Sequence, residues 1–407
     1  MLKTLYRLFF FLWLCPAAAH AIADPSDIFQ PYISETITYN DNLFYRSSSP
    51  NATPLPSGAS RDDVINQATV GSAANYTLGR QKFTLNLSVS DLSFANNKFL
   101  DNIASNDRAV WQWQFGRQLS GEVGYAYTRA MGGFTNTTFI GLNMITGNNV
   151  FANLSYTWHP RWKALTSLSW QSYTNGASQW TANDQQYTTA VASLNYTTPS
   201  NNSFGLECSF ISGKYPNRQL DGATLVDNKY QQYNSNVLLT WKISEKTSFS
   251  GKVGYIARLY PDYSQRDFGG ETYDLALNWT PTAKTMLAFS TWRRLATWTD
   301  VTASYVLTEG FSVSPMWQVS TKLSLTAKFS RQTLDYTGDQ IVQGIPTRQD
   351  TVMNGQVSLI YTPVPNVEVT LSYLAGKRDT INPNPPLNNQ PLDYLVNSLF
   401  SSIVLKF

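Results

Sequence analysis

The most regular feature of the chain is an alternation between apolar and polar residues. It is clearest over residues 83–90, 108–115, 323–330 and 367–373. A period of two is typical of β-strands that present one apolar and one polar face. After residue 23 no stretch stays apolar over the roughly 20 residues that a membrane-spanning helix needs. The pattern therefore predicts an all-β protein.

Short and long connections alternate between the predicted strands. Turn residues mark eight short connections, near 79–80, 116–117, 159–161, 199–201, 244–246, 281–283, 319–321 and 363–365. Nine longer polar segments lie between them, near 47–63, 96–107, 130–148, 174–184, 213–228, 259–268, 294–301, 335–350 and 378–391. Seventeen connections join eighteen strands. An even strand number with short periplasmic turns and long extracellular loops is typical of a transmembrane antiparallel up-and-down β-barrel, which is the fold we predict.

Aromatic residues end several predicted strands directly before a short turn. They are Phe115, Trp158, Trp241, Trp279, Trp317 and Tyr361. Aromatic girdles of this kind lie at the membrane–water interfaces of such barrels. Because every backbone N–H and C=O group in hydrocarbon needs a partner, the sheet must close on itself. We therefore expect the first strand, which begins near Tyr32, to pair with the strand that ends at Phe407.

The two ends of the chain carry features of export and assembly. Lys3 and Arg7 precede a short apolar run, and small residues allow cleavage after Ala21 or Ala23, as in a secretory signal peptide. At the other end an alternating strand stops at Phe407, which resembles the C-terminal signal read by outer-membrane assembly machinery. We expect a bacterial outer-membrane protein with a signal peptide over 1–23 and a single barrel domain over 24–407.

Composition narrows the class of protein further. Charged residues make up 14% of the chain, below the roughly 25% typical of soluble proteins, and aromatic residues make up another 14%. The formal net charge is only +3 and no basic block stands out. We therefore expect no nucleic-acid partner, and an outer face that contacts membrane lipid.

Strand parity divides the charged residues between the two faces of the barrel. If the apolar residues face lipid, eight charged side chains point into the lumen: Arg108, Glu122, Glu207, Lys242, Lys252, Asp274, Lys328 and Glu368. Strongly ion-selective channels use rings of one sign, whereas this set is balanced and lies among Ser, Thr, Asn and Gln. Such a lumen suits water and carbohydrate better than a particular ion. Because the register around 286–294 is ambiguous, Arg293 and Arg294 are assigned to neither face.

Candidate catalytic and metal-binding groups are scarce. His159 lies in a predicted tight turn, far from any long loop that could build a site. Cys208 falls on the lipid face between Leu206 and Phe210. The sequence contains no His/Cys cluster with metal-ligand spacing. We predict no catalytic residue, no cofactor, no metal and no enzymatic activity.

Several segments, in their order along the chain, resemble a known family. They are Tyr39–Phe44, Asp107–Trp113, Gly251–Tyr255, Asp267–Gly270 and Trp279–Lys284. They resemble the EpsL-type outer-membrane β-barrel proteins of exosortase-associated exopolysaccharide clusters, which are related to the putative β-barrel porin 2 family. The resemblance implies a channel that exports exopolysaccharide across the outer membrane. Its implied partners are a polysaccharide chain and periplasmic export components, and it transfers no binding residue.

Two other functions are compatible with the same barrel. One is a general or sugar-specific diffusion porin, whose channel is usually narrowed by a loop folded inward. The glycine-rich segment 130–148 could form such a loop. The other is a surface barrel that holds polysaccharide on its outer loops without conducting it. Aromatic residues in the long loops would favour this polysaccharide-holding function, but the segment 378–391 contains no aromatic residue.

The predicted orientation can be tested with inserted epitopes. An epitope after Gly338 falls in a long polar connection, so it should be tolerated and should bind antibody on intact cells. An epitope beside Pro160 falls in a short turn on the periplasmic side and should be unreachable. Whole-cell labelling measures both, and the reverse pattern would overturn the orientation.

Overall fold

The computed structural model describes most of the chain. The described residues are 28–49, 52, 54–135, 139–217, 219–220, 224–225, 229–262, 264–296, 303–338, 348–381 and 392–407. The signal peptide predicted over 1–23 lies outside them. Within these ranges no helix is long and apolar enough to cross a membrane.

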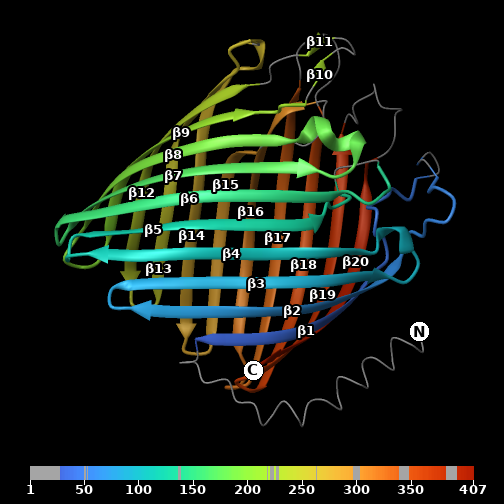
Figure 1. The fold of residues 1–407 in the computed structure, drawn as a ribbon, viewed down its shortest axis with the longest axis horizontal. Helices are drawn as coiled ribbons and strands as arrows, with labels where there is room; N and C mark the ends of the chain where they lie inside the picture. The colour runs from blue at the N-terminus through green and yellow to red at the C-terminus, as the bar shows by residue number, and fades with distance from the viewer. Residues whose placement is uncertain are drawn as a thin grey trace.

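Eighteen antiparallel strands form one closed sheet, seen from the side in Figure 1. The first nine are β1 (Phe29–Asn40), β2 (Asp63–Leu78), β3 (Gln81–Phe94), β4 (Asn102–Phe115), β5 (Leu119–Met131), β6 (Met144–His159), β7 (Trp162–Asn175), β8 (Gln185–Thr197) and β9 (Ser203–Lys214). The other nine are β12 (Tyr230–Ser244), β13 (Thr247–Leu259), β14 (Phe268–Thr282), β15 (Thr285–Ala296), β16 (Ala303–Gln318), β17 (Leu323–Gly338), β18 (Gln349–Val364), β19 (Val367–Ile381) and β20 (Tyr394–Lys406). The predicted fold and strand number are confirmed.

The remaining short elements lie in the long connections. Two strands of two residues each, β10 (Gln219–Leu220) and β11 (Thr224–Leu225), pair with each other. Three 3₁₀ helices follow β3, β7 and β13, namely η1 (Lys98–Leu100), η2 (Ser178–Asn183) and η3 (Ser264–Arg266). Because consecutive strands run in opposite directions, the short turns gather at one end of the barrel and the long connections at the other.

The first and last strands close the barrel. β1 pairs with β20 from Tyr32 opposite Lys406 to Asn40 opposite Ser398. Across this seam Thr36 Oγ1 donates a hydrogen bond to Ser402 Oγ at 2.9 Å. The backbone N–H of Phe407 donates to the Pro31 carbonyl at 2.8 Å. The predicted pairing of the two terminal strands is therefore confirmed.

Several strands extend further than the sequence predicted. β17 continues to Gly338, inside the predicted connection 335–350, and β5 and β6 leave only residues 132–143 of the predicted connection 130–148. Strands of the sheet contain 12 to 16 residues, more than the roughly ten needed to cross the hydrocarbon. Beyond the hydrocarbon both faces of a strand can meet water, so alternation fades while backbone pairing continues.

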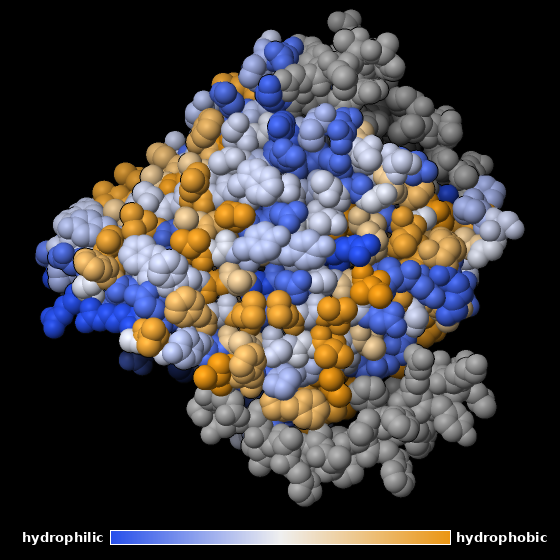
Figure 2. All heavy atoms as spheres, in the orientation of Figure 1, coloured by the Kyte–Doolittle hydropathy of each residue, from blue (hydrophilic) through white to orange (hydrophobic). Residues whose placement is uncertain are grey.

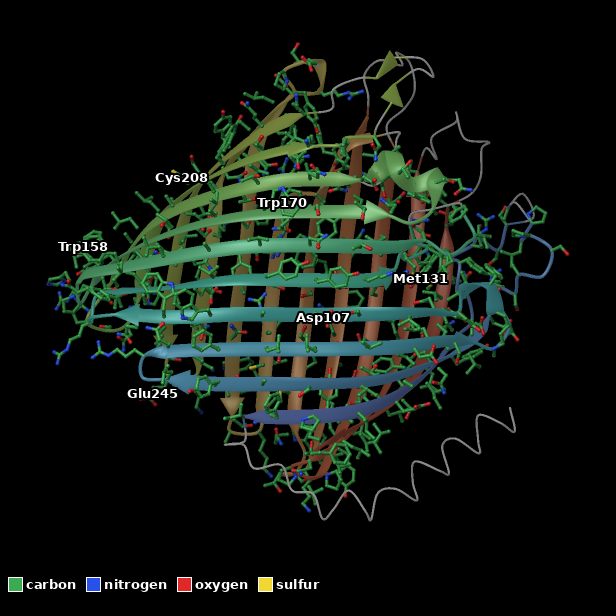
Figure 3. The ribbon with its side chains drawn as sticks, viewed as in Figure 1. Asp107, Met131, Trp158, Trp170, Cys208 and Glu245 are labelled. Atoms are coloured by element: carbon green, nitrogen blue, oxygen red, sulfur yellow. The ribbon has the colours of Figure 1, made fainter. Side chains whose placement is uncertain are left out.

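Apolar side chains cover much of the outer face. Figure 2 shows apolar and weakly polar side chains over the strands, with hydrophilic ones more frequent toward the ends. Trp158, labelled in Figure 3, is 43% exposed at the short-turn end, where its ring stacks on Trp162 at 6.2 Å between centroids. Cys208 is exposed on the same outer surface. The girdle residues therefore lie where a membrane interface would contact them.

The closing seam generates a prediction about assembly. Deleting Phe407 removes its backbone bond to Pro31 together with the terminal aromatic side chain. Phe407→Ser keeps the backbone bond and removes only the aromatic ring. If the ring is read as an assembly signal, both variants should lower the amount of heat-modifiable barrel in isolated outer membranes. Unchanged amounts for Phe407→Ser would contradict the signal role.

Candidate functional site

The connection between β5 and β6 lies inside the barrel. Its described residues, 132–135 and 139–143, are called the constriction loop here. On one side the loop faces the inner surface of β7 and β8, and on the other it faces that of β17–β20. This is the inward course that the porin alternative expected for this segment.

An apolar contact holds the constriction loop at Phe134. This side chain is only 5% exposed and packs in a cluster with Leu43, Phe44, Phe94 and Leu100. The Phe44 and Phe134 rings meet edge to face, with centroids 4.8 Å apart. Truncating a buried phenylalanine in such a cluster costs about 3–5 kcal/mol. The cluster therefore holds the loop to the connections that follow β1 and β3.

A cationic contact holds the next residue of the loop. Arg378 Nη1 donates a hydrogen bond to the Thr135 carbonyl at 2.7 Å, and Arg378 Nε donates to the Leu392 carbonyl at 2.8 Å. The guanidinium also lies over the ring of Tyr394, 4.7 Å from its centroid. Burial raises the pKa of Tyr45, and a hydrogen bond with the Thr135 side chain partly offsets that rise. Thr135 is thus held through both its backbone and its side chain.

Asp350 lies at the centre of the charges around Arg378. Its carboxylate is fully buried and accepts two hydrogen bonds from Arg348, at 3.0 and 2.5 Å. Tyr336 Oη donates a third at 2.8 Å, and Arg378 Nη1 lies 3.8 Å from Asp350 Oδ2. A buried carboxylate requires this degree of compensation, because desolvation of an ion costs several kcal/mol. The guanidinium groups of Arg348 and Arg378 thus both lie within ion-pair distance of the Asp350 carboxylate.

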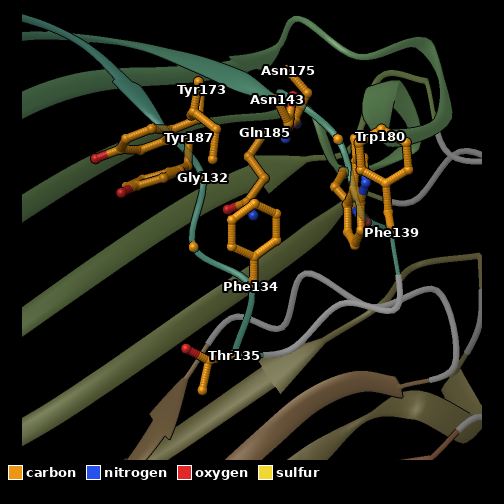
Figure 4. A pocket seen from close by; sticks show the side chains of 14 residues that line it. Gly132, Phe134, Thr135, Phe139, Asn143, Tyr173, Asn175, Trp180, Gln185 and Tyr187 are labelled. Carbon is orange, nitrogen blue, oxygen red and sulfur yellow. The ribbon is translucent and has the colours of Figure 1, made fainter. Parts of the chain in front are cut away.

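The constriction loop separates two cavities of different chemistry. The charged cavity has a volume of about 370 Å³, and its lining includes Lys328, Asp350, Arg378, Tyr45 and Thr135. The aromatic cavity has a volume of about 480 Å³ and is lined by loop residues together with Tyr173, Asn175, Trp180, Gln185 and Tyr187 (Figure 4). Thr135 lines both cavities, so the loop forms the wall between them.

Four of the eight predicted lumen residues pair with neighbours across the sheet. Lys252 Nζ lies 2.5 Å from Glu207 Oε1. Glu122 accepts hydrogen bonds from Asn153 at 2.7 Å and from Gln112 at 3.3 Å. Asp274 forms an ion pair with Arg294. The contacts of Glu122 and Asp274 join neighbouring strands, whereas the Lys252–Glu207 pair reaches across β12. Each contact gives a carboxylate a hydrogen-bond donor, which lowers the cost of enclosing it in the barrel.

The other four predicted lumen residues are spread along the sheet. The Arg108 guanidinium lies over the Phe151 ring, 4.7 Å from its centroid. Lys328 lines the charged cavity. Near the short-turn end, Lys242 lies opposite Ser248 and Glu368 lies opposite Val404. The structure does not bring the eight residues into one site, and a role for them in transport stays a prediction.

The charged residues of the Asp350 cluster are not among the lumen residues predicted from the sequence. Arg348, Asp350 and Arg378 fall in the predicted connections 335–350 and 378–391, where strand parity assigns no face. The spacing of Arg348 and Asp350, two residues apart, would have placed them on one strand face. The structure also settles the two arginines left unassigned. Arg294 pairs with Asp274, and Arg293 lies opposite Tyr273 and Glu309.

The one histidine outside the predicted signal peptide lies in a short turn. His159 is exposed at the short turn after β6, where its Nδ1 accepts a hydrogen bond from the Arg161 N–H at 3.2 Å. In the described part of the chain no three His, Cys, Asp or Glu side chains are grouped so that they could hold a metal ion.

Residues 172–388, more than half of the chain, match the family model described as "Putative beta-barrel porin 2". The chain belongs to this porin family. A search of curated proteins found no significant match. The predicted relation to the porin 2 family is confirmed, whereas membership of the EpsL-type group stays a prediction.

Two solved barrels similar to this porin-family member come from different bacteria. OccK2 (OpdF) of Pseudomonas aeruginosa has a TM-score of 0.54 and 9% identity, covering 93% of this chain and 98% of that one. OccAB3 of Acinetobacter baumannii has a TM-score of 0.51 and 9% identity, covering 93% and 99%. At this identity the similarity shows the fold alone. Family and fold together identify a porin-like barrel of the bacterial outer membrane.

The buried charge cluster of the porin generates a prediction about stability. Asp350→Asn removes the carboxylate that compensates Arg348 and Arg378, and breaking a buried pair in this way costs about 3–5 kcal/mol. We expect the free energy of unfolding to fall by that order, measured by denaturant titration of the barrel in lipid.

A matched control lies on the neighbouring strand. Lys377 and Asp379 form an ion pair at 2.8 Å in which both side chains are 51% exposed. Asp379→Asn should change the free energy of unfolding by about 0–1 kcal/mol. If Asp350→Asn and Asp379→Asn lowered the free energy of unfolding equally, burial of the Asp350 cluster would not be the cause of the loss.

Proposed function

We propose that the protein is a diffusion porin that admits small hydrophilic solutes past the constriction loop. The observation that carries this proposal is the hydrogen bond from Arg378 to the Thr135 carbonyl, which joins residues 243 positions apart. With Phe134 packed in its apolar cluster, the bond fixes the loop inside the lumen. A fixed loop leaves two cavities, each within the roughly 300–1,000 Å³ typical of small-molecule sites.

A solved relative in fold supports a small solute as cargo. OccK2 (OpdF) of Pseudomonas aeruginosa has been crystallised in complex with glucuronate, and that structure has a TM-score of 0.51 to this chain. Glucuronate is a single sugar acid. At 9% identity no binding residue carries over. The comparison supports only that a barrel of this shape can hold a solute of that size.

Export of exopolysaccharide is the second candidate function. It follows from the resemblance to EpsL-type proteins and is supported by the amide and hydroxyl groups of the inner face. A polysaccharide is a long chain, so its passage would require space along the whole lumen. Displacing the constriction loop would break both the Arg378 contact and the packing of Phe134. The fixed loop therefore favours the porin.

Reconstitution of the purified protein tests the porin function. The wild-type barrel should conduct ions in planar bilayers and should let small sugars, but not large ones, enter liposomes. Arg378→Met removes a hydrogen bond from a charged group, worth about 1.5–3 kcal/mol, so the displaced loop should become roughly 10- to 150-fold more populated. Liposome swelling should then extend to larger sugars.

Arg331→Met is the matched control for that experiment. Arg331 lies on β17 opposite Phe311, which is 43% exposed on the outer face. Its replacement should leave the size limit unchanged. A wild-type barrel that neither conducts ions nor passes any small solute would overturn the porin function.

Loss of the gene separates the candidate functions in cells. A porin predicts slower uptake of small solutes with normal surface polymer. An exporter predicts the reverse, namely lost polymer with normal uptake. A barrel that only holds polysaccharide predicts normal uptake and polymer released into the medium.

A further inference from the structure

Among the described residues that line the aromatic cavity, none carries a charge. It lies between the constriction loop, η2 and the inner faces of β7 and β8, and its volume is about 480 Å³. Lys328, Asp350 and Arg378 lie across Thr135, in the other cavity. Transfer of an ionised group into an uncharged cavity is costly. The aromatic cavity therefore favours neutral solutes.

Aromatic rings wall the cavity on opposite sides. Tyr173 and Tyr187 lie side by side on the inner face, with centroids 6.3 Å apart and planes 24° apart. Figure 4 shows Trp180 and Phe139 on the other side of the cavity. Gln171 Oε1 accepts a hydrogen bond from Tyr187 Oη at 2.7 Å. This bond helps to fix the ring of Tyr187 before any solute arrives.

The polar groups of the cavity divide into two sets. Asn143 Nδ2 donates to Asn175 Oδ1 at 2.9 Å, and Asn143 Oδ1 accepts from the Ala177 N–H at 3.1 Å. These carboxamides hold the cavity wall together. In contrast, the Gln185 carboxamide and the Trp180 indole N–H have no hydrogen-bond partner among the described residues. A carboxamide both donates and accepts, and an indole donates, so together they match the hydroxyl groups of a solute.

We propose that the aromatic cavity binds the ring of a neutral sugar. An aromatic face carries partial negative charge, so it attracts the C–H groups on the flat side of a pyranose ring. The ring's hydroxyl groups would bond to Gln185 and Trp180. The proposal rests on the porin function in one respect, because the sugar reaches the cavity through the channel.

Saturation-transfer NMR on the purified full-length barrel tests binding without requiring conduction. Methyl β-glucoside is the probe, and its ring C–H protons should receive saturation from the protein. Sorbitol, a linear polyol, should receive much less because it has no flat ring face. Trp180→Ala removes one wall and should raise the dissociation constant of the glucoside about threefold to tenfold.

Two further variants test whether glucoside binding depends on residues of the cavity. Trp170→Ala is the matched control, because Trp170 lies on β7 but is 41% exposed on the outer face (Figure 3), and it should leave glucoside binding unchanged. Gln185→Leu keeps the size of the side chain and removes its hydrogen-bonding groups, so it should also weaken binding. Each variant is used only if it shows wild-type heat-modifiability.

The outcomes separate this proposal from the porin function. No saturation of the glucoside in a barrel that conducts ions would overturn the sugar site and leave the porin intact. Equal saturation of sorbitol, or equal losses in Trp170→Ala and Trp180→Ala, would also overturn the site. Glucoside binding in a barrel that does not conduct would support the site and overturn the porin.

Discussion

Pairing of the backbone is the constraint on which the rest of this structure depends. In hydrocarbon an unpaired N–H or C=O group costs several kcal/mol, so strands can cross only if the sheet has no free edge. The β1–β20 seam meets that demand from Tyr32 to Asn40. Closure also creates an enclosed inner face. Side chains that would meet bulk water in an open sheet are there brought toward one another.

That enclosed face makes the Asp350 cluster possible. The fully buried Asp350 carboxylate is stabilised by Arg348, directly before β18, by Tyr336 on β17 and by Arg378 on β19. Arg378 in turn contacts the constriction loop at Thr135. The buried Asp350 carboxylate, its partner Arg378 and the loop that narrows the lumen are therefore connected by direct contacts.

The loop also gives the lumen two environments. On the side of β17–β20 the cavity has excess positive charge, and on the side of β7 and β8 it has aromatic rings and carboxamides without charge. If the protein is a diffusion porin, as proposed, a solute that passes the loop meets one of these two environments, according to the side it takes. The eight lumen charges predicted from parity indicate a balanced interior. They do not reveal this division, because it depends on where Thr135 lies.

The sequence by itself determined the barrel, its eighteen strands and the pairing of its ends, because alternation and short turns are local signals. It did not determine where strands end beyond the hydrocarbon, since the apolar–polar alternation fades there, and Arg348 and Asp350 fall in a predicted connection. Nor could it place Thr135 against Arg378. Only the tertiary structure decided that contact, because residues 243 apart meet only when the whole sheet has closed.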